Sequence, residues 1–352
     1  MKLPIVFSAA LVLSTASPAF EDSVVDQSIA DIQDGVYTEI DGILIYVDGE
    51  RVREHYFNQF DADQVHQTRS TFKSITGLLA AIAFDQNLLS PDELVLPLLS
   101  RYVSQESADP QRAQIRVEDL LHMTSGLDCS EMPGTGPYHD EIVDDGPEPL
   151  KHSLSIAMTA EPGKQWAYCN ANTFLLGATI SAALDRAERP NISEFANAYL
   201  FAPLGIEEYQ IYQSPDGFLY AQGNARFRPR DLAKFGLLVL NHGTWRGEQI
   251  ISNRHMQAIV DGMVGTPWSW TDLIEEHQAS DSKYAYQWFR TVFHVHGETV
   301  AVSHTWGNGG QFIFVIPSLD AVVVFTGSNY GEIEKQKQAF EILHRYLQAA
   351  VK

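Results

Sequence analysis

The chain contains 352 residues and has a formal net charge of −21, because 45 acidic side chains outnumber 24 basic ones. Hydrophobic residues make up 45% and charged residues 20%, which is typical of a folded globular protein and excludes wholesale disorder. So acidic a chain repels nucleic acid and anionic lipid, and we expect neither as a partner. Its 2 cysteines are too few for a disulfide-dense scaffold or a four-thiolate zinc site.

Residues 1–19 have the pattern of a signal peptide. Lys2 gives a positive start, and the apolar run Pro4–Leu13 is shorter than the ~20 residues that cross a bilayer. Small residues follow, so cleavage is expected after Ala19 or, alternatively, after Ala16. We expect an exported protein, periplasmic or secreted, without stable membrane insertion after cleavage. An uncleaved anchor or a buried core segment are the alternatives.

The rest of the chain predicts strands at both ends and helices in the middle. Ile43–Val47 and Val52–Tyr56 flank Asp48-Gly49 and predict a hairpin. Thr71–Gln86 is apolar on nearly every face, which predicts a buried helix. Further helices are expected at Val117–Met123, Thr173–Leu184, Ser193–Leu200, Arg230–Leu240, Asn253–Met263 and Glu332–Ala350. Further strands are expected at Tyr284–Val295, Thr299–His304, Phe312–Ile316 and Ala321–Thr326.

This order of elements predicts an α/β (α+β) fold. We expect an antiparallel sheet of five or more strands, built from both termini and flanked by helices, with a mostly helical part inserted. The sheet would come from about residues 35–90 and 284–350 and the helical part from about 91–283, within one domain spanning 35–350. The acidic segment Asp140–Pro149 is expected to be a solvated surface loop or lid.

A candidate nucleophile lies at the start of the buried helix. Ser70-Thr71-Phe72-Lys73 places Ser70 and Lys73 on one helix face, so the ammonium can reach the hydroxyl. A serine hydroxyl needs a base before it becomes a nucleophile, and a desolvated lysine can be that base. The pattern alone is weak, because Ser280–Lys283 matches it in a polar segment and Ser70 also suits an ordinary N-cap.

Two further segments suit the same chemistry. Tyr168-Cys169-Asn170 precedes the helix expected at Thr173; Tyr168 can relay a proton, and Asn170 can orient Lys73 or a substrate carbonyl. Tyr168 equally fits a half-buried aromatic at a helix start. The segment His304–Gln311 contains three glycines, which suits a strand edge along which a substrate lies, or a simple bulge or turn.

Together and in this order, the three segments resemble the motifs of the serine β-lactamase and penicillin-binding-protein superfamily. The second motif begins with a tyrosine, and in this it resembles the motif of the class C branch. The flanking sequence is similar to the esterase and nylon-oligomer hydrolase relatives of that branch, and the resemblance covers about residues 35–350. The segments that carry this similarity are Val117–Leu127, Glu161-Pro162-Gly163, Asp231–Leu237 and Gly307–Gln311.

The resemblance implies a role for each matching residue. Ser70 would be the acylated nucleophile, Lys73 and Tyr168 would transfer protons, and Asn170 would orient Lys73 and the substrate. The Ser70 amide and a backbone amide near Gly307–Gly309 would form the oxyanion hole.

The third motif departs from the family pattern of Lys/His, Thr/Ser and Gly. Either His304-Thr305-Trp306 is the motif and His304 supplies the cation, or the register shifts and Trp306-Gly307-Asn308 is the strand motif. Candidate substrate-binding residues are therefore His304, Trp306, Gly307, Asn308 and Gly309.

The resemblance also places Cys129 beside the site that contains Cys169. In an exported protein we expect these two cysteines to form a disulfide. Two buried free thiols are the main alternative, and a cysteine nucleophile is a weaker one.

We therefore expect a secreted serine hydrolase that cleaves an ester, amide or lactam bond of a small molecule through a Ser70 acyl-enzyme, without metal or cofactor. The alternatives are a β-lactamase or D-amino-acid peptidase or carboxypeptidase and, from another class, a non-turnover sensor that binds peptidoglycan or β-lactam. The sequence has no Gly-x-Ser-x-Gly elbow. His294 and His296 share a strand face, but paired exposed side chains are a simpler interpretation than a zinc site.

Overall fold

The computed structural model describes residues 20–102, 109–132, 143, 146–267 and 282–351. The predicted signal peptide, half of the acidic segment at 140–149 and Ser280 of the second Ser-x-x-Lys lie outside these ranges. Within them, no helix combines the length and apolar character needed to cross a membrane.

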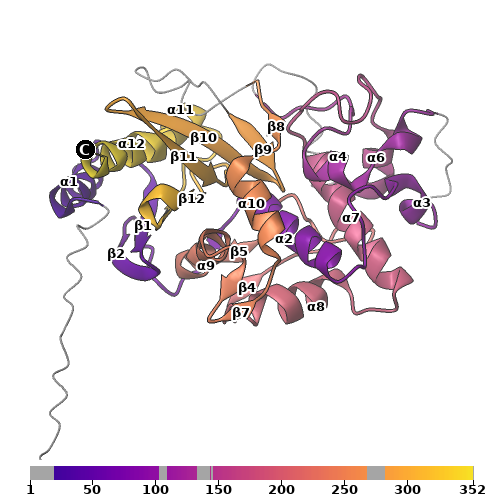
Figure 1. Ribbon diagram of the computed structural model, residues 1–352, viewed down its shortest axis with the longest axis horizontal. Coiled ribbons are helices and arrows are strands. Elements are labelled where there is room, and N and C mark those ends of the chain that lie inside the picture. Colours follow the sequence, from indigo (N-terminus) through magenta and orange to yellow (C-terminus); the bar gives the residue numbers. More distant parts are fainter. Residues whose placement is uncertain (1–19, 103–108, 133–142, 144–145, 268–281, 352) are drawn as a thin grey trace, which may run out of the picture.

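An antiparallel eight-stranded sheet forms the centre of the molecule, with the strand order β2-β1-β13-β12-β11-β10-β9-β8 (Figure 1). The first and last long strands of the chain are neighbours in it, with Leu44 opposite Val324. The prediction of a sheet built from both termini is therefore confirmed. The strands of this sheet are β1 (Ile40–Val47), β2 (Glu50–Tyr56), β8 (Val264–Gly265), β9 (Lys283–Ala285), β10 (Trp288–Val295), β11 (Glu298–His304), β12 (Phe312–Ile316) and β13 (Ala321–Gly327). A small three-stranded sheet comprises β3 (His66–Gln67), β4 (Tyr209–Gln210) and β5 (Arg226–Phe227). A two-stranded sheet comprises β6 (Thr244–Trp245) and β7 (Glu248–Gln249).

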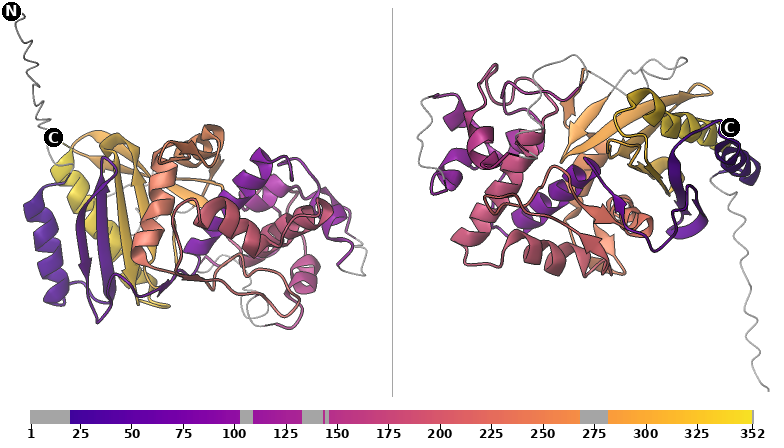
Figure 2. Two further views of the ribbon diagram at one scale, coloured as in Figure 1. Left: turned by 90° about the horizontal axis from the view of Figure 1, so that it is seen from below. Right: turned by 180° about the vertical axis from the view of Figure 1, so that it is seen from behind.

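Helices cover both faces of the sheet (Figure 2). The terminal helices α1 and α12 lie together on one face, while α9, α10 and α2 contact the strands from the other. Beside the sheet, α7 packs against α2, α3, α4 and α6 and forms the centre of the helical part. The helices are α1 (Asp22–Gln33), α2 (Thr71–Asp85), α3 (Val95–Leu99), α4 (Val117–Leu121), α6 (Pro149–Ser155), α7 (Asn170–Arg186), α8 (Ile192–Ala196), α9 (Pro229–Leu240), α10 (Asn253–Asp261), α11 (Ile333–Gln336) and α12 (Gln338–Ala350).

The two helical layers explain why β12 is apolar at every position and β13 is apolar from Ala321 to Phe325. Side chains alternate between the faces of a strand. In β13, Val322 and Val324 belong to the core on the α2 and α9 side, whereas Val323 and Phe325 belong to the core under α1 and α12. A strand covered on both faces has no position at which a polar side chain would meet water.

One predicted strand is a hairpin. The run Tyr284–Val295 divides into β9 and β10 at Tyr286 and Gln287, whose φ angles are 51° and 65°. Such a two-residue turn normally uses Asn or Gly, so the sequence has no turn signal there. Tertiary hydrogen bonds hold it instead: Tyr286 Oη lies 2.6 Å from His255 Nδ1, and the Gln287 side-chain amide donates to two backbone carbonyls of α4.

Candidate active site

The first turn of α2 lies where the sheet meets the helical part, and it carries Ser70 and Lys73. The Lys73 ammonium donates to Ser70 Oγ over 2.9 Å and to the backbone carbonyl of Gln222 over 2.9 Å. It also donates to Oδ1 of Asn170. Lys73 is 1% exposed, and these three acceptors match the three N–H bonds of an ammonium group. The spacing of the Ser-x-x-Lys motif thus brings its two polar groups into direct contact.

Threonine side chains fix this turn against the connection between β11 and β12. Thr71 Oγ1 donates to the carbonyl of Gln311 over 2.9 Å and lies 3.1 Å from Oγ1 of Thr305. The hydroxyl oxygen of Thr305 in turn accepts from the amide of Ile313 over 3.0 Å. Because all these groups are buried, the turn that carries the nucleophile is tied to β11 and β12.

The second motif is held by the disulfide between Cys129 and Cys169. Cys169 is the N-cap of α7 and Asn170 is its first residue. Two residues beyond Cys129, the amide of Glu131 donates to the carbonyl of Tyr168 over 2.8 Å. The Glu131 carboxylate accepts from the amide of Asn170. The segment 129–131 therefore supports the backbone of Tyr168 and Asn170 from both sides.

Aromatic rings surround Tyr168. Its ring centroid lies 5.7 Å from that of Phe289 and 5.6 Å from that of Trp306, and the residue is 3% exposed. On another side, Nζ of Lys73 lies 5.1 Å from the centre of the Tyr168 ring. Tyr168 is thus an aromatic wall of the site that lies beside the Lys73 ammonium.

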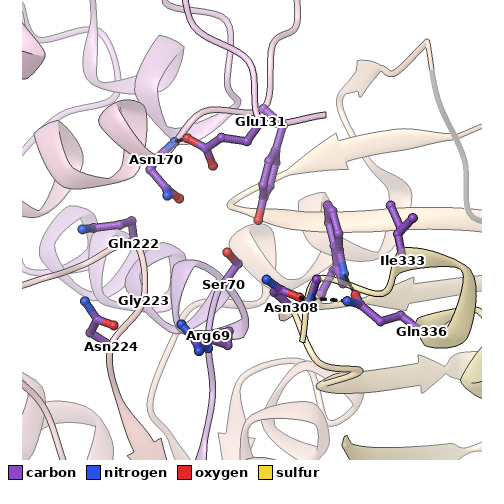
Figure 3. A pocket seen from close by; sticks show the side chains of 13 residues that line it. Arg69, Ser70, Glu131, Asn170, Gln222, Gly223, Asn224, Asn308, Ile333 and Gln336 are labelled. Atoms are coloured by element: carbon purple, nitrogen blue, oxygen red, sulfur yellow. Dashed lines mark hydrogen bonds between the residues drawn. The ribbon is translucent and has the colours of Figure 1, made fainter. Parts of the chain in front are cut away.

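Ser70, Tyr168 and Asn170 open onto one cavity of about 350 Å³ (Figure 3). Trp306 and Asn308 line it as well, which places the later part of the third motif at the site. The complete lining comprises Arg69, Ser70, Glu131, Tyr168, Asn170, Gln222, Gly223, Asn224, Trp306, Asn308, Gly331, Ile333 and Gln336.

His304 faces the other way. It is fully buried under α12, its ring stacks on Phe289 at 5.3 Å, and Nε2 lies 3.0 Å from the hydroxyl of Thr291. Burial lowers the pKa of His304 to about 3, so the imidazole is neutral at physiological pH. The expectation that His304 supplies a cation to the substrate is therefore wrong, and the Trp306-Gly307-Asn308 alternative matches the lining of the cavity better.

The glycines of this segment allow backbones to approach closely. A Cβ on Gly307 would lie 2.3 Å from the carbonyl oxygen of Thr68, and Gly309 has a φ of 107°. Neither glycine is among the residues that line the cavity. Asn308 between them points its side chain to the cavity wall, where Oδ1 accepts from the amide of Gly331 over 2.8 Å and from Gln336 over 2.9 Å.

Sequence reasoning missed eight of the residues that line the cavity, and three of them either carry a charge or contact Lys73: Gln222, Glu131 and Arg69. Gln222 acts through its backbone carbonyl, for which no residue type is a signal. Glu131 lies in the segment that connects the family-like Val117–Leu127 to the second motif, but its contact with Asn170 requires the fold. Arg69 directly precedes the nucleophile in the sequence. Its positive charge at that position is the sequence feature that could have indicated its place in the site.

Residues 25–345 match the family model described as Beta-lactamase. The chain therefore belongs to the beta-lactamase family, and with it to the hydrolases built on the serine β-lactamase fold. It is similar to the 6-aminohexanoate-dimer hydrolase of Paenarthrobacter ureafaciens, with 24% identity over 304 residues that cover 81% of this chain and 71% of the relative.

Solved structures show the same fold. The D-amino acid amidase from Ochrobactrum anthropi SV3 superposes with a TM-score of 0.63 at 17% identity, over 93% of this chain and 99% of that one. A class C beta lactamase from Rhodobacter sphaeroides superposes with a TM-score of 0.64 at 15% identity, over 92% of this chain and 99% of that one. The family resemblance and the fold class expected from the sequence are both confirmed.

Proposed function

We propose that the protein hydrolyses ester or amide bonds of small molecules through an acyl-enzyme on Ser70. The observation that carries this proposal is the 2.9 Å contact between the buried Lys73 ammonium and Ser70 Oγ, at the wall of a cavity large enough for a small substrate. Two relatives support the bond type, because a 6-aminohexanoate-dimer hydrolase and a D-amino acid amidase are by name enzymes of small amides.

In the acylation step, Ser70 Oγ attacks the carbonyl carbon and its proton passes to the deprotonated member of the Lys73 and Tyr168 pair, either the Lys73 amine or the Tyr168 phenolate. The carbonyl oxygen becomes an oxyanion. Within the described part of the chain, the backbone amides of Ser70 and Asn308 donate no hydrogen bond, so both remain available to bind that oxygen. Collapse of the tetrahedral intermediate breaks the C–O or C–N bond, and the transferred proton leaves on the alcohol or amine.

In the deacylation step, water attacks the Ser70 ester. The same pair takes a proton from the water and returns one to Ser70 Oγ as the acyl group departs as a carboxylic acid. Asn170 keeps Lys73 in place throughout, since its Oδ1 accepts a hydrogen bond from Nζ of Lys73. The cycle needs only water and the substrate.

The segment that follows β11 favours esters and amides over β-lactams. Where other members of the family carry a lysine or histidine cation, this segment presents Trp306 and Asn308 to the cavity, and His304 is buried and neutral. A β-lactam would therefore find no cation along β11 to bind its carboxylate.

A parallel rate screen tests the proposal. Wild-type protein and Ser70→Ala are assayed with p-nitrophenyl esters, D-amino acid p-nitroanilides and a chromogenic cephalosporin. We expect Ser70→Ala to lose at least roughly 10³-fold in kcat on every substrate that the wild type turns over. A serine-directed phosphonate should label the peptide that contains Ser70. Ser280→Ala is the matched control, because Ser280–Lys283 has the same spacing.

Two results would contradict the proposal. Labelling at Ser280, or full activity in Ser70→Ala, would exclude Ser70 as the nucleophile. Stoichiometric labelling at Ser70 without turnover of any substrate would favour the sensor alternative.

We also propose that the protein is exported. The signal-peptide pattern of residues 1–19 and the pairing of both cysteines support an oxidising compartment. N-terminal sequencing of the protein from the native host should find a chain that begins after Ala19 or Ala16, and an intact Met1 would count against export.

A further inference from the structure

Arg69 is a cation on the wall of the same cavity, directly before the nucleophile. Its φ of 48° lies in the left-handed region, which arginine rarely adopts. The preceding residue fixes this conformation, because the amide of Thr68 donates to the carbonyl of Ala225 over 2.8 Å and its hydroxyl to the same carbonyl over 3.0 Å. The backbone thus holds the Arg69 side chain at the cavity, where Figure 3 shows it beneath Ser70.

The Arg69 guanidinium is not neutralised by the protein. Within the described ranges it makes no ion pair, and its Nε is buried without a hydrogen-bond partner. Its guanidinium carbon lies 4.8 Å from the centre of the Tyr330 ring. A guanidinium over a ring face keeps its in-plane N–H groups free to bind an anion. By contrast, Arg230 is paired with Glu54 at 3.1 Å or less.

The other charged side chain on the cavity wall, Glu131, already has a hydrogen-bond partner within the protein. Arg69 and Glu131 are the two charged residues of the lining, and they lie on opposite sides of Ser70 (Figure 3). The Glu131 carboxylate accepts the amide of Asn170 at the start of α7. The chain as a whole, at −21, repels anions at a distance, but charges more than ~8 Å apart are largely screened at physiological salt. A short-range contact with Arg69 therefore decides whether an anionic group is accepted.

We propose that Arg69 forms an anion subsite that binds a free carboxylate of the substrate. The preferred substrates would then be esters or amides that carry a carboxylate, with that group on the Arg69 side and away from Glu131. This inference rests on the proposed function of Ser70 and narrows its substrate class. Arginine suits the role because two parallel N–H groups match both carboxylate oxygens.

Matched substrate pairs test the subsite. In the first pair, the mono-p-nitrophenyl ester of adipic acid is compared with methyl p-nitrophenyl adipate, so the carboxylate is on the acyl side. In the second, 4-acetoxybenzoate is compared with its methyl ester, so the carboxylate is on the leaving group. The quantity measured is the ratio of kcat/KM for the anionic member to kcat/KM for the neutral member, at pH 7.

Three variants of the same chain separate charge from structure. Arg69→Gln should lower the ratio roughly 10- to 100-fold in at least one pair, as expected for loss of a charge-assisted bidentate contact. Arg69→Lys keeps the positive charge but lacks the two parallel N–H groups of the guanidinium. Its ratio should fall between those of the wild type and Arg69→Gln. Arg226→Gln is the control, because Arg226 lies near Tyr330 but outside the cavity lining; its ratio should match the wild type.

The outcomes distinguish this inference from the function on which it rests. If Ser70→Ala is inactive and Arg69→Gln leaves both ratios unchanged, the subsite is refuted while the acyl-enzyme stands. An equal fall for the anionic and neutral members would show a merely structural role and would also refute it. Activity that survives Ser70→Ala would overturn both proposals.

Discussion

Removal of the disulfide between Cys129 and Cys169 should weaken both stability and catalysis. The two cysteines are separated by 40 residues in the sequence. On the chain-entropy model, a closed loop of this length stabilises the folded state by about 4 kcal/mol. Unfolding entropy of about 2.1 cal/mol/K per residue gives the 352-residue chain about 0.7 kcal/mol/K, so Tm should fall by about 5 °C.

Activity should fall before the protein unfolds. Cys169 lies between Tyr168 and Asn170, and the segment after Cys129 hydrogen-bonds to the backbone of both through Glu131. Loss of the bridge frees that segment, so we expect a lower kcat with a smaller change in KM. The substrates are neutral p-nitrophenyl esters, and Tm is followed by circular dichroism with and without dithiothreitol.

The control is the double variant Cys129→Ala with Cys169→Ala. It should resemble the reduced wild type and be insensitive to dithiothreitol. Two thiols that alkylate freely in active, unreduced protein would refute the bridge. A reduced wild type with unchanged kcat and a lower Tm would refute its role in positioning Tyr168 and Asn170.

Three further predictions concern buried polar groups. Lys73→Ala combined with Tyr168→Phe should cost little more in kcat than the worse single change, since groups that act as one unit are non-additive; losses that multiply would mean independent roles. Gln287→Leu should destabilise by about 1–3 kcal/mol in chemical denaturation, because the buried Thr173 hydroxyl loses its acceptor and the carbonyls of Leu120 and Leu121 each lose one of their donors; an unchanged free energy of unfolding would contradict this. His304 has a folded-state pKa of about 3, whereas the ordinary pKa of histidine is 6.5. Between these two pH values the unfolded chain binds more protons than the folded chain. The free energy of unfolding therefore falls as the pH drops below 6.5, by up to about 3 kcal/mol at pH 4.5. His304→Phe should remove that part of the difference in unfolding free energy between pH 7 and pH 4.5, and an unchanged difference would refute the buried neutral imidazole.

The sequence by itself determined the local geometry of the nucleophile. A helix places residues three apart on one face, so Ser70 and Lys73 had to be neighbours once Thr71–Asp85 was helical. That helix carries apolar side chains on nearly every face, which also required its burial. The alternation of strand-like and helix-like runs likewise indicated a sheet from both termini, because periodicity is a property of the segment alone.

Only the tertiary structure decided which long-range groups reach the site. His304 and Trp306 are two residues apart in a polar-aromatic run, and the sequence allowed either to face the substrate. β11 ends at His304, whose side chain packs in the core under α12, and the segment that follows leaves the strand, so that Trp306 and Asn308 reach the cavity. The carbonyl of Gln222 beside Lys73 has no sequence signal at all, because every residue has a backbone carbonyl. The unpaired charge of Arg69 depends equally on the fold, since whether a cation has a partner is set by neighbours distant in the chain.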